Sequence, residues 1–82
     1  MNLTWDEAKR KANLRKHGLD FRDTPEMFEG PMVIDLDDST EHGEERLIGF
    51  GYIKGRVVKI VFLEPNPNLI RVVSLRKATK NE

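Results

Sequence analysis

Short runs rich in apolar residues, separated by turn residues, recur over the second half of the chain, which predicts a β-sheet. The clearest run is RVVKIVFL, residues 56–63, whose β-branched and aromatic side chains favour a central strand. Residues 69–75 (LIRVVSL) predict another strand, and residues 32–36 (MVIDL) a short one. Residues 46–54 alternate only roughly between apolar residues on one face and two glycines on the other, which would let another element approach closely.

The first part of the chain has the composition of helices instead. Residues 4–17 are rich in helix formers, and Thr4 with Glu7 has the Ser/Thr-x-x-Glu spacing of a capping box at a helix start. Gly18 follows this stretch and can take the positive φ at which many helices end. We expect three residues on one face of this helix to pack on the core: Trp5, Ala8 and Ala12.

A second, shorter helix is expected over residues 20–29. It begins at Asp20 or at Thr24, since Pro25 is tolerated only in a first helical turn. Residues 76–82 again have helix-forming composition. Because short turns join the strands, we expect a two-layer α+β fold: two N-terminal helices packed on a three- to four-stranded antiparallel sheet, then a short C-terminal helix.

Length and composition limit the choice of protein class. The chain has 82 residues and no cysteine, which fits one small domain, residues 1–82, without disulfides or thiolate metal sites. Residues 1–7 are polar and acidic, unlike a signal peptide. No apolar run approaches the roughly 20 residues needed to span a bilayer, so we expect a cytoplasmic protein without a membrane partner.

The formal net charge is 0, but the charges are segregated along the chain. Residues 1–22 and 46–82 are basic, whereas residues 23–45 hold nine Asp and Glu and no Lys or Arg. Such segregation predicts either a basic and an acidic face, or charges that neutralise each other within the fold. The acidic segment weighs against RNA binding by the free chain and fits a basic protein partner.

Two side chains at the end of the first helix are the first candidates for chemistry. His17 is suited to proton transfer near neutral pH, and Lys16 can hold a phosphate. Basic residues in a last helical turn also stabilise the helix through its dipole, by about 0.3–1 kcal/mol. Position alone favours this structural role, and the two roles are compatible.

Arginines on the predicted strands are the second group of candidates. Arg71 lies in the middle of a strand and alternates with apolar residues, so it is either an ordinary exposed residue or a bidentate clamp for a phosphoryl group. Arg46 is expected on the same sheet. Tyr52 also lies within the strands, where we expect a buried aromatic residue. Three cations that follow a strand end can grip a nucleic-acid backbone or simply be solvated: Arg76, Lys77 and Lys80.

The polar segment at residues 37–45 contains acidic residues and His42, which are metal ligands in principle. Their spacing does not match a calcium loop, because the turn glycine and the final Glu are out of register. We expect a solvated loop, and neither a metal nor a cofactor.

Three groups of residues, in this order and at these spacings, resemble the BrnT family of type II toxin–antitoxin modules. The resemblance extends over the whole chain. The first group is Trp5-Asp6, Lys9, Asn13, Lys16-His17-Gly18 and Phe21; the second is Glu45-Arg46 with Gly49 and Gly51; the third is Ile70 to Ser74 followed by Arg76 to Thr79.

The resemblance implies a RelE-like fold and an endoribonuclease toxin that cleaves RNA and thereby inhibits translation and growth. It also implies a cognate, BrnA-like antitoxin that carries a DNA-binding domain and covers the active face of the toxin. Two toxins usually assemble with two antitoxins, and the complex binds operator DNA through the antitoxin.

Such cleavage needs no metal when the 2′-hydroxyl of the RNA is the nucleophile. It needs a base for that hydroxyl, a cation for the phosphate oxygens and an acid for the leaving 5′-oxygen. Our hypothesis makes His17 the general acid or base, Arg71 the clamp and Arg76 a further catalytic cation. The residues expected to bind substrate are Lys9, Lys16, Arg46 and Lys77. The alternatives are a module that binds RNA or antitoxin without cleavage, and a subunit whose charged faces only mediate assembly.

Overall fold

The structure is a computed structural model that describes residues 1–37 and 45–81. It has an α+β architecture, as expected, with two α-helices and one mixed sheet. In chain order the elements are β1 (Asn2–Trp5), α1 (Glu7–His17), the short 3-10 helix η1 (Phe21–Asp23), α2 (Thr24–Glu29), β2 (Val33–Leu36), β3 (Leu47–Ile53), β4 (Arg56–Asn66) and β5 (Leu69–Lys77). In the part of the chain that the structure describes, no helix is long and apolar enough to cross a membrane.

The sheet has five strands in the order β1-β5-β4-β3-β2, so the prediction of three or four was wrong. β2 to β5 form the expected antiparallel meander. β1 is the additional strand and pairs in parallel with β5, with Asn2 opposite Leu69 and Trp5 opposite Val72. Hydrogen bonds to residues far away in the sequence therefore decide the structure of the N-terminus.

The start of the first helix also differs from the prediction. α1 begins at Glu7, and the Asp6 carboxylate caps it by accepting hydrogen bonds from the backbone N–H groups of Ala8 (2.9 Å) and Lys9 (3.2 Å). The expected capping box is wrong, because Thr4 belongs to β1. The helix ends as predicted at Gly18, which has φ of 71° and donates its N–H to the Leu14 carbonyl (2.9 Å).

The predicted C-terminal helix is wrong. β5 continues to Lys77, and Arg76 and Lys77 pair with residues of β4. The Ala78 N–H then bonds to the Val57 carbonyl (3.1 Å), and no helix follows in the described residues, which end at residue 81. A neighbouring strand that offers hydrogen bonds therefore outweighs the local helix propensity.

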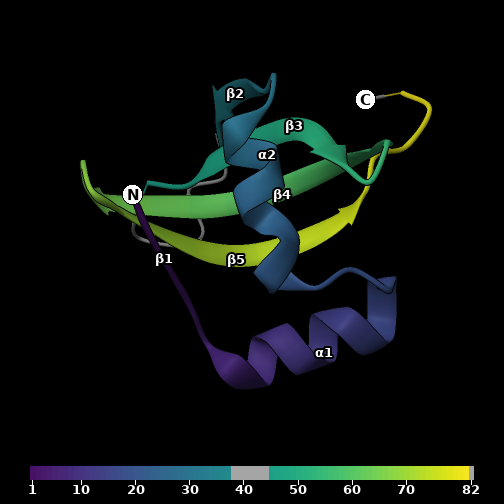
Figure 1. The fold of residues 1–82 in the computed structure, drawn as a ribbon, viewed down its shortest axis with the longest axis horizontal. Coiled ribbons are helices and arrows are strands. Elements are labelled where there is room, and N and C mark those ends of the chain that lie inside the picture. Colours follow the sequence, from purple (N-terminus) through teal and green to yellow (C-terminus); the bar gives the residue numbers. More distant parts are fainter. Residues whose placement is uncertain (38–44, 82) are drawn as a thin grey trace.

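The hydrophobic core lies between the helices and one face of the sheet. Figure 1 shows α2 lying across the sheet and α1 running beside β5. α2 begins at Thr24, with Pro25 in its first turn as predicted. The core side chains come from every layer: Leu19, Phe21, Met27, Ile53, Val58, Ile60, Phe62, Ile70, Val72 and Leu75.

The other face of the sheet is called the open face below. It carries the alternate residues of β4, Val57, Lys59, Val61 and Leu63, together with their partners on β3 and β5. Tyr52 pairs with Val57 there and is 50% exposed, so the expectation of a buried aromatic residue was wrong.

Candidate functional site

α1 packs on the rest of the protein through polar residues. Ala8 and Ala12 are exposed and Trp5 lies in β1, so the predicted apolar face of this helix was wrong. The buried residues of α1 are Arg10 and Asn13. The helix therefore depends on specific hydrogen bonds for its position.

Asn13 connects α1 to the far half of β5. Its side-chain amide donates to the Leu19 carbonyl (3.2 Å), and its side-chain oxygen accepts the backbone N–H of Leu75 (3.1 Å). β1 ends opposite Val72, so within the described part of the chain the far half of β5 has no strand partner on that side. The Asn13 side chain of α1 accepts a backbone hydrogen bond from this edge instead, and this contact holds the last turns of the helix beside residues 73–75 of β5.

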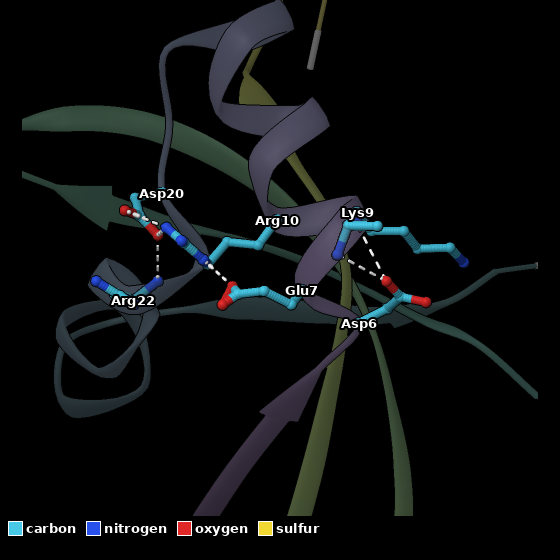
Figure 2. A network of polar contacts seen from close by, with 7 residues as sticks. Asp6, Glu7, Lys9, Arg10, Asp20 and Arg22 are labelled. Atoms are coloured by element: carbon cyan, nitrogen blue, oxygen red, sulfur yellow. Dashed lines mark hydrogen bonds and ion pairs between the residues drawn. The ribbon is translucent and has the colours of Figure 1, made fainter.

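Arg10 holds the turn that follows α1. Its guanidinium donates to the Glu7 carboxylate within the helix and to the Asp20 carboxylate (3.0 and 3.2 Å) beyond it, as Figure 2 shows. Asp20 also accepts the Arg22 backbone N–H (3.0 Å), so it caps η1. These contacts fix the chain on both sides of Gly18.

The same contacts shift the acidity of both carboxyls. The Arg22 backbone N–H, followed by the Arg10 guanidinium, lowers the pKa of Asp20. The hydrogen bond from Arg10 likewise lowers the pKa of Glu7. Both groups are therefore held as carboxylates at neutral pH, and they anchor the only cation buried in α1.

An open depression of about 250 Å³ lies between α1 and β5. Three of the predicted site residues meet here, because Lys9, Lys16 and His17 all line it. The remaining lining residues are Ala12, Asn13, Val73 and Ser74. No carboxylate is among these residues, so the depression presents two ammonium groups and an imidazole to a ligand. Such a surface suits an anion such as a phosphodiester.

A β-bulge shapes the strand side of the depression. Phe62 pairs with Val72 and Val61 with Ser74, which leaves Val73 as the extra residue of β5. Ser74 then continues on the open face. Bulges bend a strand and redirect its side chains, and they recur next to active sites.

Arg71 and Arg76 lie outside the depression but on the same strand. Their partners on β4 are Leu63 and Lys59, and Ser74 pairs with Val61 between them, so all three residues of β5 share the open face. Arg76 follows Ser74 at about 7 Å along the strand. Arg71 is exposed, and Arg76 donates to the Lys77 carbonyl (3.0 Å). The open face thus carries arginines on either side of the residue that it shares with the depression.

Arg46 and Lys77 are not brought to this place. Arg46 precedes β3, two strands away from β5, and its Nε is buried without a hydrogen-bond partner among the described residues. Lys77 pairs with Val58, so its side chain lies on the opposite face of the sheet from Arg71.

The acidic loop and a bound metal are the remaining expectations to compare with the structure. Most of the acidic loop, including His42, falls in residues 38–44, outside the described residues. Within the described residues, no three His, Asp or Glu side chains gather to hold a metal ion. A neighbouring depression of about 300 Å³ beyond Gly18 mixes both charges through Asp23, Lys54 and Arg56, and it contains none of the predicted site residues.

Sequence reasoning missed several residues that build the site, among them Asn13, which holds α1 on β5. Ser74 joins the depression to the open face, and Arg10 positions the end of α1. Ser74 ends the third group of residues that resembles the BrnT family, but no local pattern assigns it to a site. Arg10 had one available signal, the i, i+3 spacing from Glu7 that suits a helical ion pair. Its second partner, Asp20, comes from the tertiary structure.

Comparisons with known proteins agree with this architecture. Residues 5–82 match the family model described as the ribonuclease toxin BrnT of type II toxin–antitoxin systems. The crystal structure of the Brucella abortus ribonuclease toxin BrnT superposes with a TM-score of 0.73 at 30% sequence identity, and the match covers 98% of this chain and 99% of that one. A search of curated proteins finds no match. The chain therefore belongs to the BrnT family of ribonuclease toxins of type II toxin–antitoxin systems.

Proposed function

We propose that this protein cleaves RNA without a metal ion, at the depression between α1 and β5. The observation that carries the proposal is the meeting of Lys9, Lys16 and His17 in one open hollow without a carboxylate in its lining. A ribonuclease must hold a phosphodiester and move protons beside it. The two lysines supply positive charge for the first task, and the histidine supplies an acid–base group for the second.

In the proposed reaction the RNA provides its own nucleophile. The 2′-oxygen attacks the adjacent phosphorus while its proton leaves to a base, and the bond from phosphorus to the 5′-oxygen breaks. The leaving oxygen takes up a proton, so the products are a 2′,3′-cyclic phosphate and a 5′-hydroxyl. We assign His17 to one of the two proton transfers, and the electrostatic field of Lys9 and Lys16 lowers the cost of the charge that develops on the phosphate.

We assign Arg71 and Arg76 to the RNA phosphate groups where the bound strand passes from the depression onto the open face. A guanidinium keeps its charge and can bind two phosphate oxygens at once, which suits stabilisation of the transition state. Both arginines share their face of β5 with Ser74, which lines the depression. Arg46 and Lys77 lie elsewhere, so they can bind only an RNA that extends beyond the cleaved bond.

The biological setting of the proposal follows from the family. Residues 1–82 act as one toxin domain with a RelE-like fold in the cytoplasm, where RNA cleavage inhibits translation and growth. A BrnA-like antitoxin neutralises the toxin as a complex with two copies of each protein, and it supplies the contacts with operator DNA. The assignment of the family to type II toxin–antitoxin systems supports these roles.

The decisive experiment is cleavage of a structured RNA by purified protein in the presence of EDTA. We expect cleavage to persist and the products to carry 2′,3′-cyclic phosphates. His17→Ala should slow cleavage by about 10²-fold or more, the usual effect of losing a general acid or base. Lys11→Ala is the matched control, because Lys11 is an exposed cation of α1 outside the depression. Loss of activity in EDTA, or equal rates for both variants, would contradict the proposal.

One observation favours a second function, RNA or antitoxin binding without cleavage. His17 is the one histidine among the residues that line the depression and no carboxylate accompanies it, whereas cleavage needs both a base and an acid. A binding module would retain RNA intact, with an affinity that falls steeply as salt rises. The cleavage assay separates the two functions directly.

A further inference from the structure

The edge strand β2 exposes every one of its side chains. Val33 is 70% exposed, Ile34 50% and Leu36 56%, and Asp35 is exposed as well. Among the described residues, β2 is the last strand of the sheet, with β3 on one side and no strand on the other. Proteins usually protect such edges, because an unpaired apolar strand is a template for pairing with another chain. This strand is therefore a candidate interaction surface.

The backbone of β2 is arranged for a further strand. The Asp37 N–H bonds to the Arg46 carbonyl (2.9 Å), so that pair is a hydrogen-bonded pair of the antiparallel ladder. Such pairs alternate, which turns the polar groups of Asp35 and Val33 towards β3 and those of Ile34 and Leu36 outward. The Leu36 N–H is bonded to the neighbouring Asp35 carboxylate (3.2 Å), while Ile34 directs its N–H and C=O to the free edge.

Apolar surface flanks this edge on both faces of the sheet. Val33 lies on the open face opposite Phe50, whereas Ile34 pairs with Gly49 on the face that the helices cover. Tyr52 and Val57 are 50% and 45% exposed and extend the apolar part of the open face. An added strand would thus find partners for its alternate side chains as well as for its backbone.

Charge decides which partner fits. Residues 23–45, which contain β2, carry nine acidic residues and no Lys or Arg. Among the described residues, Asp35 and Asp37 lie on or beside the strand. Glu45 immediately precedes the partly buried Arg46, whose backbone carbonyl accepts the Asp37 N–H. A second copy of this chain would place the same acidic strand along the edge, and like charges facing each other repel. A basic strand is complementary.

We propose that an extended, basic segment of the cognate antitoxin binds to β2 as a sixth strand. This inference rests on the proposed function, because it takes the antitoxin as the partner. β2 and β5 are three strand spacings apart, roughly 14 Å, so the docking strand is separate from the depression. Changes at β2 therefore weaken neutralisation of the toxin without changing its cleavage of RNA.

The test compares Ile34→Pro with Ile34→Ala. Both variants replace the isoleucine side chain with a smaller one, but only proline removes the outward N–H, in a position that an edge strand tolerates. The probe is the purified antitoxin encoded beside this chain, and its dissociation constant is measured by calorimetry. We expect Ile34→Pro to bind about tenfold or more weakly than Ile34→Ala, because a hydrogen-bond acceptor of the partner is left unsatisfied. Equal affinities would overturn the proposal.

RNA cleavage by the same proteins separates this inference from the proposed function. Both variants should cleave at the rate of the unsubstituted protein. If that protein itself does not cleave, the proposed function fails while the comparison of affinities still stands.

Amide hydrogen exchange of the unsubstituted protein gives a second measurement that needs no variant. The Ile34 amide should exchange fast in the free protein and become protected in the antitoxin complex. An Ile34 amide that stays unprotected in the complex would overturn the proposal. Protection that appears in the free protein as its concentration rises would assign the edge to a second copy instead, and would also overturn it.

Discussion

Asn13 shows how one buried amide can position a candidate active site. It joins the Leu19 carbonyl and the Leu75 N–H, and it also lines the depression beside Lys9 and His17. Asn13 belongs to the first group of residues that resembles the BrnT family, but it was not predicted as a site residue. Its contact with Leu75, 62 positions away, was not.

We predict that Asn13→Ala lowers the stability of the protein by about 1–3 kcal/mol. The substitution leaves the buried Leu75 N–H without its acceptor, and the cost of an unsatisfied buried donor has this size. Asn13→Asp keeps an acceptor for Leu75 and should lose less. Thermal unfolding followed by circular dichroism measures both, with Lys11→Ala as the exposed control. A melting temperature that Asn13→Ala leaves unchanged would refute the role of this amide.

Asp20 links stability to pH. Its pKa is lowered by the Arg22 N–H and by Arg10, so its stabilising effect is complete above the pKa of an unfolded aspartate, near 4, and is lost as pH falls through the lower folded value. We predict that Asp20→Asn destabilises the protein at pH 7, where Arg10 loses its charged partner beyond the helix. The difference from the unsubstituted protein should shrink below pH 4.

Urea unfolding of the two proteins at pH 7 and at pH 3 measures this difference. Asp23→Asn is a suitable control for loss of one negative charge, because the Arg10 guanidinium donates to Glu7 and Asp20 and not to Asp23. A difference that stays constant with pH would show that the Asp20 charge does not contribute.

At the level of elements, β3 packs closely against the segment before β2, and the two glycines of β3, Gly49 and Gly51, differ in how much space surrounds them. A Cβ at Gly49 would lie 2.8 Å from the Met32 sulfur and 3.0 Å from Ile60 Cγ2, distances that require a neighbour to move. A Cβ at Gly51 would meet ordinary contacts of 3.4–3.5 Å. The prediction from sequence that these glycines permit a close approach is therefore confirmed most strongly at Gly49.

We predict that Gly49→Ala destabilises the protein by about 1–3 kcal/mol, the usual cost of overpacking a core. Gly51→Ala is the matched control on the same strand and the same face, and it should change stability far less. Chemical unfolding of the two variants measures the contrast. If both glycines tolerate alanine equally, the close approach of Met32 does not constrain β3.

The turns of the meander follow local rules, whereas the ends of the chain do not. Lys54 and Gly55 form a tight turn with φ of 51° and 78°, the positive values of a type I′ hairpin. Thr4 and Trp5 were predicted to lie in the first helix, yet they form part of β1 because β5 offers them backbone hydrogen-bond partners. Strands at the edges of a sheet are thus the elements that local sequence patterns predict least well.

For the whole molecule, we predict that expression of this chain in bacteria arrests growth. His17→Ala and Arg71→Ala, at matched expression, should abolish the arrest if these side chains act on the RNA as proposed. Co-expression of the cognate antitoxin should relieve the arrest by the unsubstituted protein. Growth curves with Lys11→Ala as a control measure the effect, and full toxicity of both site variants would contradict the assignment.

The sequence sufficed for the α+β class, the meander, the helix end at Gly18 and the grouping of Lys9, Lys16 and His17, because these depend on neighbours within a few residues. The family resemblance was likewise visible in three short motifs, and the comparisons confirm it.

The tertiary structure was needed for everything that rests on contacts between distant segments. The strand β1, the extension of β5 through Arg76, the bulge at Val73 and the exposed edge of β2 all depend on which strands become neighbours. The placement of α1 depends on Arg10 and Asn13, whose partners are Asp20 and Leu75. Polar groups of strands and buried side chains must form hydrogen bonds, and this requirement overrides local propensity. Local sequence patterns do not identify the distant residues that supply the partners.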